Sequence, residues 1–288
     1  MLDLYHHGSS VCAAKVRFAL AEKGVEWNSH YLDILAGDQF DPEYMKLNPK
    51  AVVPTIVHDG QVIVESTVIC EYIDETFDGP SLVPATPLER ARMRLWTKTV
   101  DEVIHPACAE FTFVSCHRFV VLRLGDEGVE EFLSATPRRS VTTAWKKRKR
   151  DLVLIGIDTP GVDAKIRAYD HYLGEMEATL RQHKWLAGDT FSLADIGLPP
   201  YVNRLDMLGM SGLWDQGRRP HVEDWFNRIK ARPTFKPMFL DWCPEDLTND
   251  LMTFGSQTFP RILEILGRTP EECSLIPDED GLCMCAMG

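Results

Sequence analysis

The 288-residue sequence has little that would suit a membrane, a secreted disulfide framework or a nucleic-acid surface. No stretch approaches the roughly 20 consecutive apolar residues that span a bilayer, and the apolar start at residues 2–5 is too short for a secretory signal. The eight cysteines are widely scattered, which favours reduced thiols. A net charge of −12 opposes phosphate binding. The composition therefore predicts a cytoplasmic protein with no membrane and no nucleic-acid partner.

Metal-binding patterns and basic clusters are also sparse. The spacing of His105, Cys108, Cys116 and His117 matches no common zinc motif, so no metal is predicted. Residues 146–150 form one basic run, for which a solvated loop or helix face is a simpler interpretation than an anionic partner.

The first 80 residues have the pattern of a small α/β domain. A short strand at residues 2–5 precedes an amphipathic helix that ends at Gly24, and residues 25–32 predict a second strand. Asp59-Gly60 separates two β-branched runs and favours a tight antiparallel hairpin. A helix follows from Ser66. This order predicts a mixed sheet with helices on its faces.

The rest of the chain is predicted to be helical, beginning after a turn-rich linker at residues 78–87. Ser192 and Asp195 have the spacing of a helix capping box. We expect an all-α domain over residues 88–267 and a loosely ordered tail over residues 268–288. The expected helices cover residues 88–121, 162–182, 222–232 and 260–267.

Ser9 and Ser10 fall at the junction of the first strand and first helix, followed closely by Cys12. The amino end of a helix favours an anion, and a hydroxyl there can donate a hydrogen bond to a bound thiolate. Simple capping of the helix is the alternative, and it needs only one serine.

Two further junctions have the residues of a binding site. Val53-Pro54 precedes the hairpin, where a cis proline would leave the backbone of Val53 free to pair with a peptide-like ligand. Glu65-Ser66 begins a helix, so Ser66 can hold a carboxylate while Glu65 accepts from an ammonium group; a capped helix is again the alternative.

Together these features resemble the cytosolic glutathione transferases over about residues 1–240. The matching stretches are SSVCAAKVR, NPKAVVPTI, VESTVICEYIDE and FSLADI. The resemblance implies a thioredoxin-like N-terminal domain, an all-α C-terminal domain, and glutathione as co-substrate.

The resemblance also implies roles for particular residues. Val53 beside Pro54 would pair with the cysteinyl part of glutathione, Glu65 and Ser66 would hold its γ-glutamyl end, and Lys50 its glycyl carboxylate. An alignment with zeta-type enzymes makes Ser10 the thiolate partner, whereas a delta-type alignment makes it Ser9. Cys12 offers a third possibility, a mixed disulfide with glutathione as in omega-type enzymes. We favour Ser10.

Within the superfamily, GQVIVESTVICEYIDETF and RMRLWTKTVDE are most similar to bacterial glutathione-dependent β-etherases. The resemblance implies attack of the glutathione thiolate on a lignin-derived β-aryl ether in a homodimeric or heterodimeric enzyme. The alternatives are a non-catalytic or partner subunit, a dehalogenase and an isomerase. We expect the hydrophobic aromatic substrate to lie between the domains, near Phe111, Phe113, Ser115 and Arg118.

Overall fold

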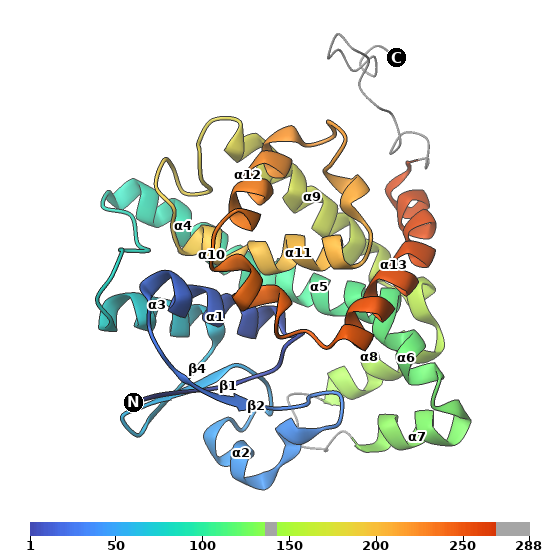
Figure 1. Ribbon diagram of the computed structural model, residues 1–288. Coiled ribbons are helices and arrows are strands. Elements are labelled where there is room, and N and C mark those ends of the chain that lie inside the picture. Colours follow the sequence, from blue (N-terminus) through green and yellow to red (C-terminus); the bar gives the residue numbers. More distant parts are fainter. Residues whose placement is uncertain (136–142, 269–288) are drawn as a thin grey trace, which may run out of the picture.

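A computed structural model describes residues 1–135 and 143–268 (Figure 1). The N-terminal domain is built on a four-stranded sheet of order β2-β1-β3-β4. β1 is parallel to β2 and antiparallel to β3, which is antiparallel to β4. The strands are β1 (Leu2–His6), β2 (Asn28–Tyr31), β3 (Thr55–His58) and β4 (Gln61–Val64). Positive φ at Asp59 and Gly60 confirms the tight hairpin, because a type I′ turn requires it at both positions.

Three helices complete this domain: α1 (Val11–Lys23), α2 (Pro42–Leu47) and α3 (Ser66–Thr76). α1 and α3 lie between the sheet and the helical domain, whereas α2 lies on the other side of the sheet (Figure 1). α1 is therefore buried almost all round, including the charged side chains of Lys15 and Arg17. Gly24 ends α1 in the left-handed conformation, as its position predicted.

One long helical rod begins the C-terminal domain. It consists of α4 (Pro87–Thr99), α5 (His105–Thr112) and α6 (Arg118–Leu122), joined by the π-helical segments Val100–Ile104 and Phe113–His117. Pro106 lies at the start of α5 and lacks an N–H for the helix ladder, which accounts for the first wide turn.

The remaining helices pack around this rod (Figure 1). They are α7 (Gly125–Ala135), α8 (Thr143–Leu154), α9 (Val162–Leu180), α10 (Leu193–Gly197), α11 (Pro199–Met207), α12 (Pro220–Lys230) and α13 (Glu245–Leu266). No helix within the described ranges has the length and apolar character needed to cross a bilayer.

One helical expectation needs correction. The helix expected at residues 260–267 is the end of α13, which begins at Glu245 and contains Pro260 in its interior. Buried side chains on both sides of this proline, including Leu251 and Ile262, hold one continuous helix despite the local signal to begin there.

The basic run at residues 146–150 belongs to α8, so of the loop or helix face expected for it the structure shows the helix. Arg148 donates to both carboxylate oxygens of Glu110, and Arg150 does the same to Glu130. The charges of Arg148 and Arg150 are therefore paired within the fold, because α8 packs near acidic side chains from other helices.

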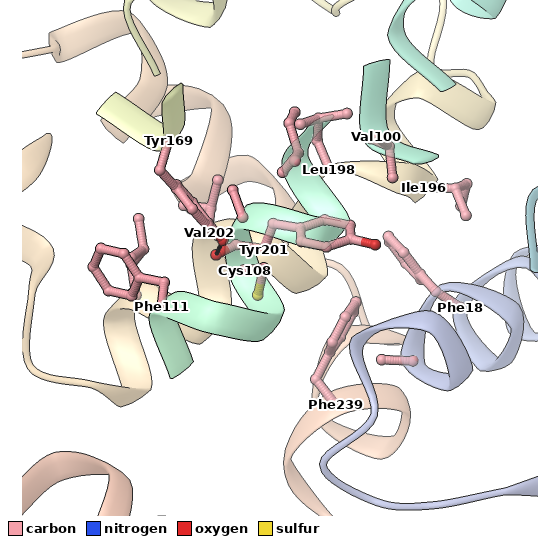
Figure 2. Close-up of a cluster of buried hydrophobic side chains, with 14 of the residues drawn as sticks. Phe18, Val100, Cys108, Phe111, Tyr169, Ile196, Leu198, Tyr201, Val202 and Phe239 are labelled. Atoms are coloured by element: carbon pink, nitrogen blue, oxygen red, sulfur yellow. Dashed lines mark hydrogen bonds between the residues drawn. The ribbon is translucent and has the colours of Figure 1, made fainter. Parts of the chain in front are cut away.

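Phe18 of α1 joins the two domains. Its ring lies 6.0 Å from that of Phe191 and 5.3 Å from that of Phe239, measured between centroids. Figure 2 shows the same cluster continuing through Tyr201 of α11 towards Phe111 of α5. The N-terminus of α1 is consequently fixed against α5 and α11, which positions the candidate site.

Candidate functional site

The serine loop, residues 7–10, connects β1 to α1. Ser10 is the N-cap: its Oγ accepts a hydrogen bond from the Ala13 N–H at 3.2 Å. A hydroxyl that accepts one bond still has a proton to donate. Ser10 therefore caps the helix and can also donate to an anion, so the two interpretations of this serine are compatible.

Ser9 differs because its hydroxyl is turned inward. Its Oγ lies 3.0 Å from Nδ1 of His7, and the same Nδ1 accepts the backbone N–H of Ser9. Burial lowers the pKa of His7 to about 4, so the imidazole is neutral at physiological pH. Since Nδ1 is the acceptor, the Ser9 hydroxyl donates its hydrogen bond to the ring of His7. This geometry favours Ser10 over Ser9 as a thiolate partner.

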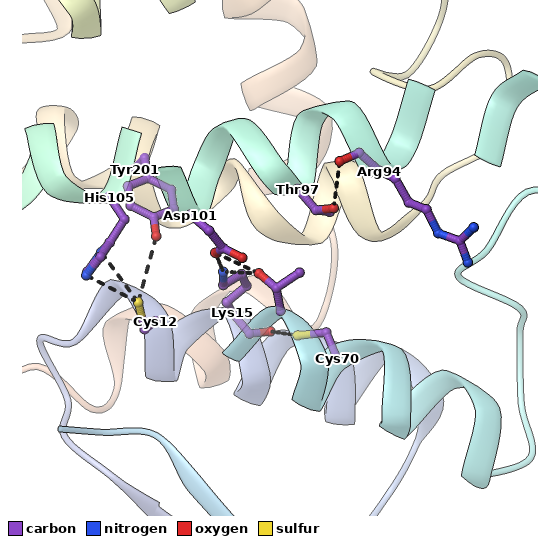
Figure 3. A network of polar contacts seen from close by, with 9 residues as sticks. Cys12, Lys15, Cys70, Arg94, Thr97, Asp101, His105 and Tyr201 are labelled. Atoms are coloured by element: carbon purple, nitrogen blue, oxygen red, sulfur yellow. Dashed lines mark hydrogen bonds and ion pairs between the residues drawn. The ribbon is translucent and has the colours of Figure 1, made fainter. Parts of the chain in front are cut away.

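Cys12 is the second residue of α1 and lies under the helical domain (Figure 3). Its Sγ is 3.4 Å from Nδ1 of His105 and 3.8 Å from Oη of Tyr201. Burial opposes ionisation of the thiol, but the charge of His105 and its hydrogen bond outweigh burial and lower the pKa of Cys12 to about 6. The negative sulfur in turn raises the pKa of His105. The contact therefore favours the charged forms of both side chains, a thiolate at Cys12 and an imidazolium at His105.

Alkylation of Cys12 by iodoacetamide tests this pair, because only the thiolate reacts readily. The rate is expected to be half-maximal near pH 6, to stay high above that pH and to fall as the thiolate is protonated below it. His105→Gln should move the half-maximum upward. Mass spectrometry of the modified peptide measures the rate, with half-buried Cys243 as an internal control. A Cys12 half-maximum near that of an ordinary thiol, about pH 8.5, would contradict the pairing.

The other two predicted junctions face a common region of the N-terminal domain. The Val53-Pro54 peptide is cis, which meets the condition stated for a free Val53 backbone, and the sheet register begins only at Thr55. Glu65 has a positive φ of 70°, a strained conformation of the kind found at functional sites. Its carboxylate accepts a 2.5 Å hydrogen bond from Lys50. Both side chains are more than half exposed and can exchange partners readily.

The predicted aromatic pocket is less open than the sequence suggested. Phe111 is 1% exposed and packs on Tyr169, so it belongs to the core shown in Figure 2. Ser115 is completely buried with no partner for its Oγ among the described residues. Phe113 is also buried, close to the ring of His117. Phe111 and Ser115 therefore offer no surface to a substrate in this conformation.

Arg118 is occupied elsewhere. Its Nε donates to the carbonyl of Val153 at 2.8 Å, and its guanidinium lies over the ring of Phe119. A different arginine, Arg204 of α11, reaches the serine loop and donates to the carbonyl of Ser9. The sequence reasoning missed Arg204, although a lone arginine in the otherwise uncharged stretch PPYVNRL was a usable signal.

The segment after α12 covers the serine loop. A Cβ atom placed on Gly8 would lie 1.7 Å from the carbonyl oxygen of Trp242, so only glycine allows this approach. A cavity of about 20 Å³ remains beneath the segment, with Ser9, Ser10 and Arg204 in its wall. Apolar atoms of Met207, Phe239 and Cys243 complete the enclosure.

The thiols agree with the expected reduced state as far as the structure describes them. Cys12, Cys70, Cys108, Cys116 and Cys243 are free. In residues 1–135 and 143–268, no three His, Cys, Asp or Glu side chains gather as a metal-binding group. Residues 269–288, which contain Cys283 and Cys285 and were expected to be a loose tail, lie outside the described part.

Comparison with protein families identifies the class that this fold and site define. Residues 9–76 match the glutathione S-transferase N-terminal domain, and residues 151–233 match the C-terminal domain. The chain belongs to the glutathione transferase family, which uses glutathione as co-substrate. The predicted fold and the assignment to glutathione-dependent transferases are thereby confirmed.

Several individual relatives span most of the chain. LigF of Sphingobium sp. strain SYK-6 is 32% identical over 251 residues, covering 85% of this chain and 96% of LigF. The crystal structure of this β-etherase matches with a TM-score of 0.74 over 83% of this chain and 99% of LigF. A tetrachloro-p-hydroquinone reductive dehalogenase of Sphingobium chlorophenolicum is 29% identical, covering 82% of this chain and 94% of the dehalogenase.

Proposed function

We propose that this transferase cleaves β-aryl ethers with glutathione. The observation that carries the proposal is the similarity to the β-etherase LigF over almost the whole of both folds. Support comes from the serine loop, where Ser10 has a free hydroxyl proton at the amino end of α1. The dehalogenase and isomerase relatives belong to the same family, so the electrophile is the part of the proposal that most needs testing.

The glutathione thiol must first lose its proton. An ordinary thiol has a pKa near 8.5, so only a few per cent is ionised at neutral pH. Lowering that pKa by about 2 units requires about 2.7 kcal/mol of preference for the anion. A hydrogen bond from Ser10, at roughly 1.5 to 3 kcal/mol, and the end of α1, at roughly 0.3 to 1, together contribute about 1.8 to 4 kcal/mol, a range that includes this value.

The thiolate then displaces the aryloxide. Its sulfur forms a bond to the carbon that carries the ether oxygen, while the carbon–oxygen bond breaks and its electron pair leaves with the phenolate. Protonation of the phenolate by solvent gives a phenol and a glutathione thioether. Val53, Glu65, Ser66 and Lys50 are proposed to hold glutathione in the orientation required for this attack.

The direct test incubates the purified chain with glutathione and a β-aryl ether that carries an α-ketone. We expect equal amounts of phenol and glutathione thioether, measured by liquid chromatography with mass spectrometry. Glutathione binding by calorimetry without either product would contradict ether cleavage and favour another electrophile or a partner subunit. Size-exclusion chromatography of the same sample tests the expected homodimer or heterodimer with a related subunit.

A second candidate activity is thiol–disulfide exchange, which the Cys12–His105 contact favours. The Cys12 thiolate would attack one sulfur of glutathione disulfide, break the sulfur–sulfur bond and release a glutathione thiolate. Cys12→Ala should abolish this exchange and leave ether cleavage largely intact. If Cys12→Ala instead keeps the exchange and loses ether cleavage, Cys12 and not Ser10 is the group that ether cleavage requires.

A further inference from the structure

Two arginines are buried against the serine loop, and within the described ranges neither has a carboxylate partner. Arg17 of α1 is fully buried and donates to the carbonyls of His7 and Gly8, each at 3.2 Å. Arg204 of α11 is 5% exposed and donates to the carbonyl of Ser9. The carbonyls of three consecutive residues therefore point at two buried guanidinium groups.

Arg204 also has hydrogen-bond donors that the protein does not use. Its Nε and Nη1 are buried without a partner among the described residues. The cavity of about 20 Å³ lies between this guanidinium and the two serines, and it has room for about one water molecule. Buried charged donors without acceptors cost free energy. An anion that forms beside Ser10 would offset that cost.

Nearby titratable groups do little to neutralise Arg204. Burial lowers the pKa of His7 to about 4 and that of His117 to about 3, so both rings are neutral at physiological pH. Burial raises the pKa of Cys116 to about 12 and also raises that of Cys108, so these thiols remain protonated. Other charged or titratable groups that face the loop are Arg17, His6, Tyr31, Asp33, Asp38 and Cys243.

Among these remaining groups, Asp33 is an acidic side chain beside His7 of the loop, and it is half exposed to solvent. The carboxylate of Asp33 is 3.9 Å from Nε2 of His7, and its side chain is 52% exposed. Burial lowers the pKa of Arg17 to about 9, so Arg17 is still charged at neutral pH. Arg17 and Arg204 therefore place two positive charges against the carbonyls of residues 7–9, next to the end of α1, while the exposed carboxylate of Asp33 acts on His7.

We propose that Arg204 is a positioning residue whose charge stabilises the glutathione thiolate held by Ser10. The inference rests on the proposed glutathione chemistry of the serine loop. Ser10 supplies a directional hydrogen bond, whereas Arg204 fixes the Ser9 carbonyl and acts on the sulfur through the small cavity. The thiolate-stabilising charge thus comes from the helical domain, and packing of that domain on the serine loop completes the site.

The test measures the pKa of the glutathione thiol bound to the enzyme by ultraviolet difference titration of the thiolate. Arg204→Gln removes the charge, and the thiol pKa should rise by about one unit. At a pH below both pKa values, kcat/KM should then fall about tenfold. Arg204→Lys keeps the charge and should keep the thiol pKa within a few tenths of a unit.

Arg228→Gln is the matched control, because Arg228 lies on α12 and donates to the Lys184 carbonyl, away from the loop. It should leave the titration unchanged. Arg204→Met gives a second neutral variant in case glutamine prevents folding, which circular dichroism would reveal. An unchanged thiol pKa in a folded neutral variant, or an equal rise in the lysine variant, would overturn the inference. Failure of the unaltered chain to bind glutathione would overturn the proposed function as well.

Discussion

Replacing Ser10 by glycine is expected to lower kcat/KM for glutathione-dependent ether cleavage by roughly 10- to 100-fold. The variant loses the hydrogen bond that the Ser10 hydroxyl donates to the thiolate, and such charge-assisted bonds contribute roughly 1.5 to 3 kcal/mol. Initial rates over a range of pH should show the loss most strongly at neutral pH. At high pH free glutathione ionises unaided, so activity should partly recover there.

Glycine is the informative substitution because Ser10 also caps α1. Replacing an N-cap serine with alanine typically costs about 1 kcal/mol of stability, whereas glycine costs only a few tenths. Thermal melting should therefore be nearly unchanged in Ser10→Gly. A large loss of activity in a stable protein would then report the missing hydroxyl and not a weakened helix.

Ser9→Ala is the matched control for Ser10→Gly. The Ser9 hydroxyl donates to His7 inside the loop, so its removal should change kcat/KM by less than about threefold. The assignment is wrong if Ser10→Gly keeps full activity while Ser9→Ala or Cys12→Ala loses it. If Ser9→Ala loses activity, the Ser9 side chain would have to leave its inward rotamer when glutathione binds. If Cys12→Ala loses activity, the Cys12 thiolate would have to move when glutathione binds.

Asp195→Ala is expected to destabilise the protein by about 3 to 5 kcal/mol. The buried carboxylate of Asp195 accepts hydrogen bonds from the backbone N–H groups of Leu186 and Ser192 and from Nε1 of Trp225. Alanine would leave these donors buried without acceptors. Urea unfolding followed by circular dichroism measures the change in the free energy of unfolding.

Glu89→Ala provides the comparison, since Glu89 occupies the corresponding position at the start of α4. Its carboxylate accepts from the hydroxyl of the N-cap Thr86, whose side chain is exposed. A cap of this kind contributes about 0.5 to 1 kcal/mol. If both variants lose the same small amount of unfolding free energy, the network around Asp195 contributes only as a helix cap. Its burial then adds nothing to stability.

Much of the N-terminal domain could be predicted because its signals are local. The hairpin depends on Asp59 and Gly60 alone, and the end of α1 depends on Gly24. The capping box needs only Ser192 and Asp195, three residues apart, and it formed as expected. Where the sequence reasoning failed, as at Pro260 inside α13, packing of buried side chains outweighed a correct local preference.

In the candidate site too, local sequence predicted some features, and three-dimensional contacts decided the others. Ser10, Pro54 and Glu65 are at junctions of strands and helices, so the sequence itself placed them at the ends of elements where ligands bind. The sequence could not choose among Ser9, Ser10 and Cys12, because that choice depends on what each side chain contacts. The inward hydrogen bond of Ser9 to His7 becomes visible only in three dimensions.

The sequence by itself determined the two family domains, the helix ends and the positions of the candidate glutathione residues at the ends of elements, because these depend on neighbours along the chain. Tertiary structure alone decided which charges reach them. His105 is 93 residues from Cys12, and Arg204 is 195 residues from Ser9. No local sequence pattern encodes contacts between residues so far apart along the chain. These contacts form when Phe18 and its partners pack the helical domain onto α1.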